Sequence, residues 1–556
     1  MKHFKILAAV YLLTLGNTLF AQSSNADSAS TYYKRANQCF QKNDFTGSFF
    51  WYEELFKIPL INYQNNYNFY RTSVSACQIN NPDKALFYFN KMVSNFLDYG
   101  NYPYFANDSL AKCIKETYEW KSAMAYMKPR YDSVMESIRL YYIGITDKSK
   151  RLNKSQLTDT TYLSKFFTEN DFDKIYSTLK SFKNYSKPPV LNHWTLYEIK
   201  VNDTLTVPFL VYIPKSYKSN IKTPLYLFLH GAAGNRPEFS VQSTVPEFEL
   251  PFSQNPIKEN AFFVYPYARK DINWLYHPLA FEAISNEIAF LKSLYNIDDN
   301  KVYITGHSDG GRGVFYFAIN KPTDFASFLS LNYFPQSLIT NTSLRNLRSD
   351  ETLYGISGKS DFLFNFKKVD SIYNYGKSIG DNWVNYAFDQ GHGLPYDTSD
   401  LINFIYDTLI QKTRNPFPKT VEWETDNINN GRYKWIEITK LDTSLKKENW
   451  VQTYNPNVTS KDNSTIINFN KNKTGIIKAS ISGNEVTITS SCISEFSFYV
   501  YPELVDITKP IKFNINKKTF FKVIPKADKN DLAKEFAKTK DRTMLPIEKI
   551  TLGFGD

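Results

Sequence analysis

The sequence predicts a multidomain chain that is all-α at its start, α/β with a mostly parallel, doubly wound sheet in its middle, and β-rich at its end. Three observations predict this order. Apolar residues recur at helical spacing over residues 27–130, short apolar runs alternate with helical patterns over 191–413, and short strand patterns separated by turns fill 416–556. A chain of 556 residues is long enough to build several such cores.

Composition and charge narrow the class of protein. Hydrophobic residues make up 42% of the chain and charged residues 22%, which is ordinary for globular proteins and argues against general disorder. The net charge is +11, but the lysines are spread along the chain among nearly as many acids. Because there is no basic block, we expect a solvated surface and no nucleic-acid partner.

Residues 1–21 have the pattern of a secretory signal peptide. Basic residues at Lys2 and Lys5 precede an apolar run from Ile6 to Leu15, and the small residue Ala21 follows. The run is shorter than the roughly 20 residues of a membrane-spanning helix, and no cysteine follows it to carry a lipid. We therefore expect export to the periplasm or the outside, with no membrane span. An N-terminal anchor is the alternative.

The four cysteines predict no disulfide framework. Cys39, Cys77 and Cys113 lie in helical patterns and Cys492 in a strand pattern, so we expect buried free thiols. None has the paired spacing of a zinc site, and we expect no structural metal.

Within 27–130, two stretches align with each other. The aligned positions are Ala36, Phe45, Ser48, Tyr52 and Leu55 against Ser73, Pro82, Ala85, Phe89 and Met92. Ser48 and Ala85 are 37 residues apart, close to the tetratricopeptide period of about 34. The segment resembles tetratricopeptide repeats, which implies a possible surface for a protein partner. A plain helical bundle is the alternative.

Residues 131–190 are polar and predict a linker with one amphipathic helical stretch, Tyr162 to Phe182, ended by Pro188-Pro189. The apolar period then changes. Strand patterns end at Val201 and begin again at Val207, with the turn residues Asn202-Asp203 between them, so we expect a hairpin.

The central segment alternates strands and helices. The expected strands are Leu225–Leu229, Ala261–Tyr265, Val302–Thr305, Phe325–Leu331, Leu353–Ile356 and Trp383–Phe388, with a helix over Leu279–Tyr295. Nearly continuous apolar strands indicate a parallel sheet covered on both faces.

Beyond Pro416 the pattern is again β. The expected strands are Lys434–Ile438, Thr465–Phe469, Ile476–Ile481, Val486–Thr489, Phe496–Tyr501, Ile511–Ile515 and Thr519–Val523. Ser482-Gly483-Asn484 predicts a hairpin turn, and short antiparallel strands predict a small sandwich. A late helix is expected over Lys529–Lys538.

The motif Gly-His-Ser-Asp-Gly, with its serine at Ser308, follows the apolar strand Val302–Thr305 and precedes the helical pattern Val314–Ala318. This is the context of a nucleophile elbow, in which Gly306 and Gly310 allow close backbone approach. The helix N-terminus favours negative charge developing beside the serine. We therefore expect Ser308 to be a nucleophile.

A serine nucleophile needs a base, and in this arrangement the chain order is Ser, then acid, then His. His392 is the only one of the six histidines after Ser308, and it directly follows the strand pattern Trp383–Phe388. Asp361, just after the preceding strand, is the expected acid. The competing carboxylates are Asp324, Asp370 and Asp389.

Two amides are expected to stabilise an oxyanion, that of Asp309 and one from the Gly-rich loop after the third strand, for which we choose Ala232. His230, Gly231 and Gly234 are expected to support that loop, and His307 to supply shape beside the nucleophile. Lys359 is expected to be a solvated loop residue, while His193 and His277 carry no argument.

With these residues in place, 191–413 resembles the polyhydroxybutyrate-depolymerase and feruloyl-esterase-like branch of the α/β-hydrolases. The carrying motifs are His230-Gly231-x-x-Gly234, Asn273-Trp274, Asn296-Ile297-Asp298 and Gly306-His-Ser-Asp-Gly-Gly311. The resemblance implies a secreted carboxylic ester hydrolase with a Ser-Asp-His triad and no cofactor, and leaves polyester, aryl and carbohydrate esters open as substrates.

Two other functions remain open. Prolyl-oligopeptidase-like peptidases share the fold, but they usually look like Gly-x-Ser-Tyr-Gly-Gly, whereas Asp309 follows the serine here. The third hypothesis is an envelope interaction protein, in which the helices bind a partner and the hydrolase fold is inactive.

Overall fold

The computed structural model describes residues 28–58, 63–64, 66–96, 102–146, 156–185, 187–188, 191–235, 260–361, 363–389, 391–392, 408–409, 411–459, 464–466, 469–517 and 519–553. The expected signal peptide, 1–21, lies outside these residues. Contacts divide the chain into two compact units that part at Ser137, and each is described by itself.

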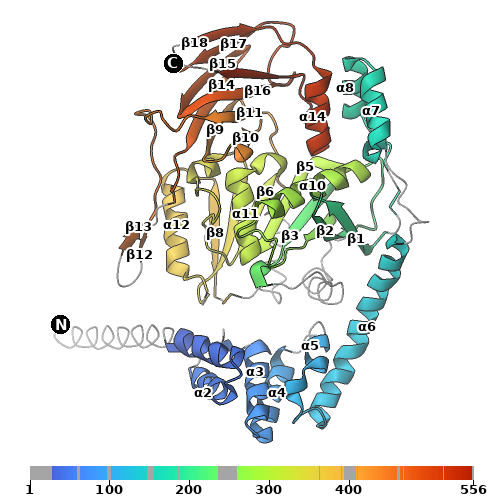
Figure 1. The fold of residues 1–556 in the computed structure, drawn as a ribbon, viewed down its shortest axis with the longest axis vertical. Helices are drawn as coiled ribbons and strands as arrows, with labels where there is room; N and C mark the ends of the chain where they lie inside the picture. Colours follow the sequence, from blue (N-terminus) through green and yellow to red (C-terminus); the bar gives the residue numbers. More distant parts are fainter. Residues whose placement is uncertain are drawn as a thin grey trace, which may run out of the picture. The chain divides into compact units, whose positions relative to one another are not determined.

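The first unit is all-helical (Figure 1). Its helices are residues 28–41, α2 (Phe45–Phe56), α3 (Asn66–Gln78), α4 (Pro82–Phe96), α5 (Tyr102–Asn107), the 3-10 turn η3 (Ser109–Ala111) and α6 (Tyr118–Thr146). Asp44 caps α2 by accepting a hydrogen bond from the Gly47 amide at 2.9 Å, which satisfies one of the free amides at the helix start.

The positions aligned in the sequence share their burial. In both stretches four of the five aligned residues are buried, and Phe45 and Pro82 are the pair that is not. Ser75 donates a hydrogen bond to Ser48 at 3.1 Å, because small residues let α2 and α3 approach. Assignment to tetratricopeptide repeats stays a prediction.

The expectation of free thiols is wrong for two of the four cysteines. Cys77, in α3, forms a disulfide with Cys113, just after η3, while Cys39 and Cys492 are free. The sequence placed both half-cystines in helical patterns without showing that the two segments meet. A pairing between residues 36 positions apart depends on tertiary packing.

The segment expected to be a linker, 131–190, is ordered structure wherever the structure describes it. The boundary at residue 130 falls inside α6, which continues to Thr146. The single amphipathic stretch is two helices, α7 (Thr160–Glu169) and α8 (Phe172–Lys180), separated at Asn170-Asp171 because Asp171 caps α8. Ile175 and Leu179 are buried with Leu532 and Phe536 from near the end of the chain.

The second unit contains a mixed sheet of eight strands in the order β1-β2-β4-β3-β5-β6-β7-β8 (Figure 1). The strands are β1 (His193–Lys200), β2 (Thr206–Ile213), β3 (Thr223–Leu229), β4 (Phe262–Pro266), β5 (Ile297–His307), β6 (Ser327–Leu331), β7 (Thr352–Gly358) and β8 (Trp383–Phe388). β2 pairs antiparallel with β1 and β4, and the remaining pairings are parallel. This layout is compatible with an α/β-hydrolase fold.

Three helices pack against the sheet: α10 (Pro278–Leu294), α11 (Asp309–Asn320) and α12 (Phe366–Ser378). The strands β3 and β4 are almost entirely buried, as their continuous apolar runs predict. Coverage of both faces by helices stays a prediction. The parallel strands run in the same direction. Their carboxyl ends therefore lie together at one edge of the sheet, and these strands include β3, β5, β6, β7 and β8.

The last part of the chain contains two further sheets. One has the order β10-β11-β16-β19 and the other β18-β17-β15-β14-β9, and β12 pairs with β13 alone. The strands are β9 (Thr420–Thr425), β10 (Arg432–Tyr433), β11 (Ile436–Leu441), β12 (Asn457–Thr459), β13 (Ser464–Ile466), β14 (Gly475–Ser482), β15 (Glu485–Ser491), β16 (Ile493–Val500), β17 (Ile511–Ile515), β18 (Thr519–Val523) and β19 (Glu548–Gly553). Trp423, in β9, and Trp435, between β10 and β11, are fully buried in one hydrophobic core.

Several expectations for this part need correction. The strands β9, β10, β12 and β19 were not predicted from the sequence. The expected strand at Lys434 begins at Ile436, and the expected strand at Thr465 ends at Ile466. The strands were expected to be antiparallel, but β15 and β17 run parallel, because between them the chain passes through β16 in the other sheet. The late helix, α14 (Lys529–Thr539), lies where it was expected.

Buried charges join α10 and β5 to the residues that follow α14. Lys292 lies 3.3 Å from Asp299 and 3.5 Å from Asp541, and all three side chains are at most 2% exposed. Arg542 binds Asp299 at 3.1 Å, and Arg414 binds Asp541 at 2.8 Å. Pairing of this kind is required for buried charges, so the C-terminal segment is part of the same folded unit. Among the described residues, no helix is both long and apolar enough to cross a bilayer.

Candidate active site

Ser308 lies in the one-residue turn between β5 and α11. Its φ of 57° and ψ of −115° lie in a backbone region that residues other than glycine rarely adopt, and Ser308 is 8% exposed. The strained turn places the serine at the carboxyl end of a central strand, directly before the first turn of a helix. The Ser308 amide donates to the Leu331 carbonyl at 2.9 Å, which fixes the turn against β6.

Two glycines allow this turn to form. A Cβ on Gly306 would collide with the Gly310 carbonyl oxygen, and a Cβ on Gly310 would collide with the Leu229 carbonyl oxygen. These clashes are with backbone, which cannot move aside. The motif therefore needs glycine at both places so that β3, β5 and α11 can meet.

The structure brings Ser308, His392 and Asp361 together in one chain of hydrogen bonds. Ser308 Oγ lies 2.9 Å from His392 Nε2, and His392 Nδ1 lies 2.8 Å from Asp361 Oδ2. The His392 side chain is 12% exposed and that of Asp361 is 3% exposed. Since a carboxylate only accepts, His392 Nδ1 carries the hydrogen and Nε2 is left as the acceptor facing the serine.

The second carboxylate oxygen of Asp361 is also held. Its Oδ1 accepts hydrogen bonds from the amides of Leu363 at 2.8 Å and Phe364 at 2.9 Å. With both oxygens occupied, the carboxylate cannot rotate away from the histidine. The loop after β7 therefore presents the acid in one orientation.

The competing carboxylates have other surroundings. Asp324 ends a 3-10 turn before β6, and Asp370 on α12 accepts from the side chain of Asn374 at 2.9 Å. Asp389 is 86% exposed and pairs with Lys359 at 2.9 Å. None of them contacts His392 in the part of the chain that the structure describes. Lys359, expected to be a solvated residue, is half exposed in this ion pair.

The Gly-rich loop after β3 lies against Ser308. A Cβ on Gly231 would meet Ser308 Cβ at 3.2 Å, so the Gly231 backbone is almost in contact with the serine. The next residue, Ala232, has a positive φ of 52°. Gly234, in the 3-10 turn Ala233–Asn235, has more room, because a Cβ added to it would lie 3.6 Å from the Leu275 side chain. This loop therefore lies against Ser308, and the Asp309 amide follows Ser308 directly at the first position of α11.

His230 supports this loop through two hydrogen bonds. Its Nδ1 lies 2.8 Å from the Gly231 carbonyl oxygen and its Nε2 accepts from the Ala268 amide at 3.1 Å, so Nδ1 donates. The ring is 2% exposed and lies 4.8 Å from that of Trp274. The neighbouring Asn273 is buried and accepts from the amides of Leu275 and Tyr276 at 3.0 and 3.2 Å. The Asn273-Trp274 motif therefore packs beside His230, which supports the Gly-rich loop.

Two side chains hold the loop that carries His392: His307, which the sequence placed beside Ser308, and Asn332, which sequence reasoning missed. The carbonyl oxygen of His392 accepts from His307 Nε2 at 2.7 Å and from Asn332 Nδ2 at 3.2 Å. Asn332 Oδ1 accepts from the Gly358 amide at 2.8 Å, so this side chain joins the ends of β6 and β7 to the base loop. The available signal was position, since Asn332 directly follows a buried strand, at the edge where such sheets carry their sites.

Burial keeps His307 neutral. Desolvation, with a smaller effect from His392, lowers the pKa of His307 from 6.5 to about 3. A neutral ring has one N–H, and because its Nε2 faces a carbonyl oxygen, Nε2 carries it. His307 therefore acts as a donor to the His392 backbone and adds no positive charge beside Ser308.

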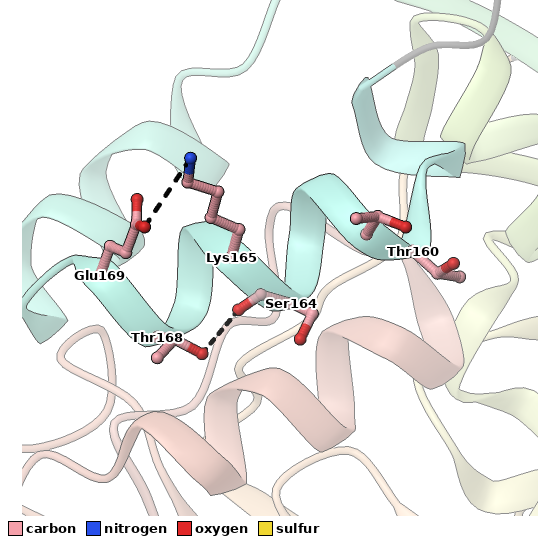
Figure 2. A pocket seen from close by; sticks show the side chains of 6 residues that line it. Thr160, Ser164, Lys165, Thr168 and Glu169 are labelled. Atoms are coloured by element: carbon pink, nitrogen blue, oxygen red, sulfur yellow. Dashed lines mark hydrogen bonds and ion pairs between the residues drawn. The ribbon is translucent and has the colours of Figure 1, made fainter.

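Other features of the second unit lie apart from these residues. Among the described residues, no three His, Cys, Asp or Glu side chains gather as a metal site would require. A pocket of about 530 Å³ is lined by the polar face of α7, where Lys165 pairs with Glu169 at 3.8 Å (Figure 2). It shares no residue with the Ser308 site. His277 precedes α10 and makes no capping bond there, and His193 begins β1.

Comparisons with known proteins give structural matches only, since no family model and no curated protein matches the chain. The chain is similar to a thermostable esterase, with 18% identity over 41% of this chain and 65% of that one, at a TM-score of 0.34. An acylaminoacyl peptidase from Pyrococcus horikoshii matches with 16% identity over 41% of this chain and 44% of that one, at a TM-score of 0.32.

A ferulic acid esterase matches with 15% identity over 40% of this chain and 99% of that one, again at a TM-score of 0.32. The chain thus spans less than two thirds of the length of the first two structures. Because these identities and scores are low, we infer function from the geometry of the site.

Proposed function

We propose that this protein is an exported serine hydrolase that cleaves carboxylic esters through a triad of Ser308, His392 and Asp361. The observation that carries the proposal is the hydrogen-bond chain of 2.9 Å and 2.8 Å from Ser308 through His392 to Asp361. It combines a strained serine at a helix start, a histidine in the right tautomer and a fixed carboxylate. These are the three roles that acyl transfer requires.

In the acylation step, His392 Nε2 takes the proton of Ser308 Oγ as the oxygen attacks the acyl carbon. Asp361 holds the ring and stabilises the imidazolium that forms. The tetrahedral oxyanion receives hydrogen bonds from the amides of Asp309, directly after the serine, and Ala232, in the loop after β3. His392 then gives its proton to the leaving alkoxide, which departs as the alcohol and leaves an ester on Ser308.

In the second step, water gives a proton to His392 Nε2 and attacks the ester on Ser308. The new tetrahedral oxyanion uses the same two amides. Its collapse releases the carboxylic acid, and the proton on His392 returns to Ser308 Oγ. Each turnover therefore consumes one ester and one water and needs no cofactor.

The substrate group and the compartment belong to the proposal as well. The resemblance to depolymerase and feruloyl-esterase-like enzymes favours a polyester, aryl or carbohydrate ester. The Cys77–Cys113 disulfide supports export, because disulfides persist in oxidising compartments. We keep a protein partner of the helical unit as part of the same proposal.

The test is hydrolysis of 4-nitrophenyl acetate by the purified full chain. Ser308→Ala should lower turnover at least about 10³-fold, while Ser371→Ala, a change on the surface of α12, should leave it unchanged. Retained turnover in Ser308→Ala, with the same folding by circular dichroism, would contradict the assignment.

The same assay separates the two other functions. A peptidase would cleave a proline-containing chromogenic peptide in preference to the ester, and would lose that activity in Ser308→Ala. An inactive scaffold would cleave neither substrate.

A further inference from the structure

Arg312 is a cation one helical turn beyond the nucleophile. Its amide donates to the Ser308 carbonyl at 3.1 Å, so it lies in the first turn of α11. The rest of the helix from Gly313 to Asn320 is buried and mostly apolar, whereas Arg312 is partly buried. An arginine at this place is not explained by packing of the helix against the sheet.

An aromatic ring joins Arg312 to the catalytic base. The guanidinium carbon of Arg312 lies 5.3 Å from the centre of the Phe364 ring. The same ring meets that of His392 at 5.4 Å and 66°. The backbone amide of Phe364 holds Asp361, so this ring is fixed by the acid loop. Arg312 and His392 therefore contact one rigid aromatic side chain.

The Arg312 side chain makes no ion pair and no hydrogen bond to any residue that the structure describes, and its Nε is buried without a partner. Burial lowers the pKa of Arg312, and the nearby charge of Asp309 only partly offsets this. The deeper arginines behave differently: Arg345 pairs with Glu422 and Glu424, Arg414 with Asp541, and Arg542 with Asp299.

A partly buried cation without a counter-ion costs folding free energy. Around Arg312 the fold supplies an aromatic face in place of a carboxylate, although it supplies carboxylates to three other arginines. The missing counter-ion is thus best supplied by a ligand that reaches the first turn of α11. In an ester hydrolase, the molecule that reaches this place is the substrate.

We propose that Arg312 binds a carboxylate carried by the ester substrate, so that the enzyme prefers anionic esters to neutral ones. This inference rests on the proposed function. A guanidinium presents paired N–H donors in a plane that match a carboxylate. The Phe364 face limits the motion of the guanidinium and excludes water from one side of it. The net charge of +11 attracts anions toward the molecule as a whole.

The carboxylate can belong to the acid part or to the alcohol part of the ester, and two matched substrate pairs separate these sources. The first pair is mono-4-nitrophenyl glutarate and its methyl ester, which differ in the acid part. The second pair is 4-acetoxybenzoate and its methyl ester, which differ in the alcohol part. We expect kcat/KM to favour the anionic member of one pair by about 10- to 100-fold.

The test variant is Arg312→Gln, which keeps a polar side chain and removes the charge. It should reduce the anionic-to-neutral ratio of kcat/KM to near one, mainly through KM, whatever happens to the neutral ester. Arg312→Lys should restore part of the ratio. The matched control is Lys359→Gln, which removes a cation already paired with Asp389 and should leave the ratio unchanged.

A binding measurement makes the result independent of turnover. Ser308→Ala protein should bind the preferred anionic ester, detected by calorimetry, and the double variant with Arg312→Gln should not. Equal turnover of both members of both pairs would overturn the inference while leaving the ester hydrolase intact. Absence of ester turnover, together with binding that Arg312→Gln does not weaken, would overturn both proposals.

Discussion

His307 is an uncharged histidine placed one residue before Ser308. Its Nε2 donates to the His392 carbonyl at 2.7 Å, and burial lowers its pKa from 6.5 to about 3. Between pH values of about 3 and 6.5, the His307 side chain therefore binds a proton in the unfolded chain and not in the folded protein. Stability is full above about pH 6.5 and is lost as the pH falls toward 3.

We predict that His307→Gln removes this part of the pH dependence, because glutamine keeps an N–H donor and does not titrate. The wild-type free energy of unfolding should fall by up to about 1.4 kcal/mol per pH unit more steeply than that of the variant below pH 6. Urea unfolding at pH 7.5, 6 and 5 measures the difference. Parallel curves for the two proteins would show that another group dominates.

At the scale of single residues, chain order predicted much of the candidate site. His392 was the only histidine available after Ser308, and Asp361 was favoured by its place after a strand; the structure brings both to the serine. Asn332 and Arg312 were not singled out. The one sign of Asn332 in the sequence was its place directly after a buried strand, whereas nothing in the sequence marks Arg312, because its importance depends on which side chains surround it in space.

At the scale of elements, β3, β5 and α11 meet so closely that a methyl group cannot be added between them. A Cβ on Gly310 would strike the Leu229 carbonyl oxygen, whereas one on Gly234 would make an ordinary contact at 3.6 Å. Gly310→Ala should therefore destabilise the protein by about 3 kcal/mol or more. Gly234→Ala should change the free energy of unfolding by less than about 1 kcal/mol. Chemical denaturation compares them, and equal effects would contradict the role given to this crossing.

The disulfide between α3 and the segment after η3 is a second prediction at this scale. Alkylation of the unfolded, unreduced protein should label Cys39 and Cys492 and leave Cys77 and Cys113 unlabelled. Cys77→Ser/Cys113→Ser should lower the stability of the helical unit by about 2–4 kcal/mol, because the bond joins residues 36 positions apart. Peptide mass spectrometry checks the first point; four labelled cysteines would contradict the pairing.

Elements with a local pattern were predicted well. The bounds of β8 and β17 match the strands expected over Trp383–Phe388 and Ile511–Ile515. The parallel pairing of β15 with β17 was not predicted, because neighbours that are not consecutive in the chain are chosen by tertiary packing. The expected linker helix is two helices, α7 and α8, for a related reason, since they pack against α14, about 360 residues later.

At the scale of the whole second unit, Asp541 and Arg542, just after α14, pair with charges on α10 and β5. Arg542 is 4% exposed; it binds Asp299 at 3.1 Å and donates to the Asn296 side chain at 2.9 Å. Removing one partner leaves an uncompensated buried charge, so Arg542→Ala should cost about 3–5 kcal/mol. Lys509→Ala, which breaks an exposed pair with Asp506, should leave the free energy of unfolding nearly unchanged.

Urea unfolding of both variants measures this coupling, with the Ser308 assay as an independent readout. We expect Arg542→Ala to lower the urea concentration at which ester turnover is half lost, as well as the urea concentration at which the β-rich part is half unfolded. If only the β-rich part were weakened, the two would be separate folding units, contrary to the shared charge cluster.

The central claim, that Ser308 is an activated nucleophile, is tested most directly by covalent labelling. The full chain is treated with a fluorophosphonate, digested and mapped by mass spectrometry, beside a correctly folded His392→Ala variant. We predict label on the peptide that contains Ser308, and its loss in His392→Ala. An unlabelled Ser308 in the folded wild-type protein, or equal labelling without His392, would contradict the claim.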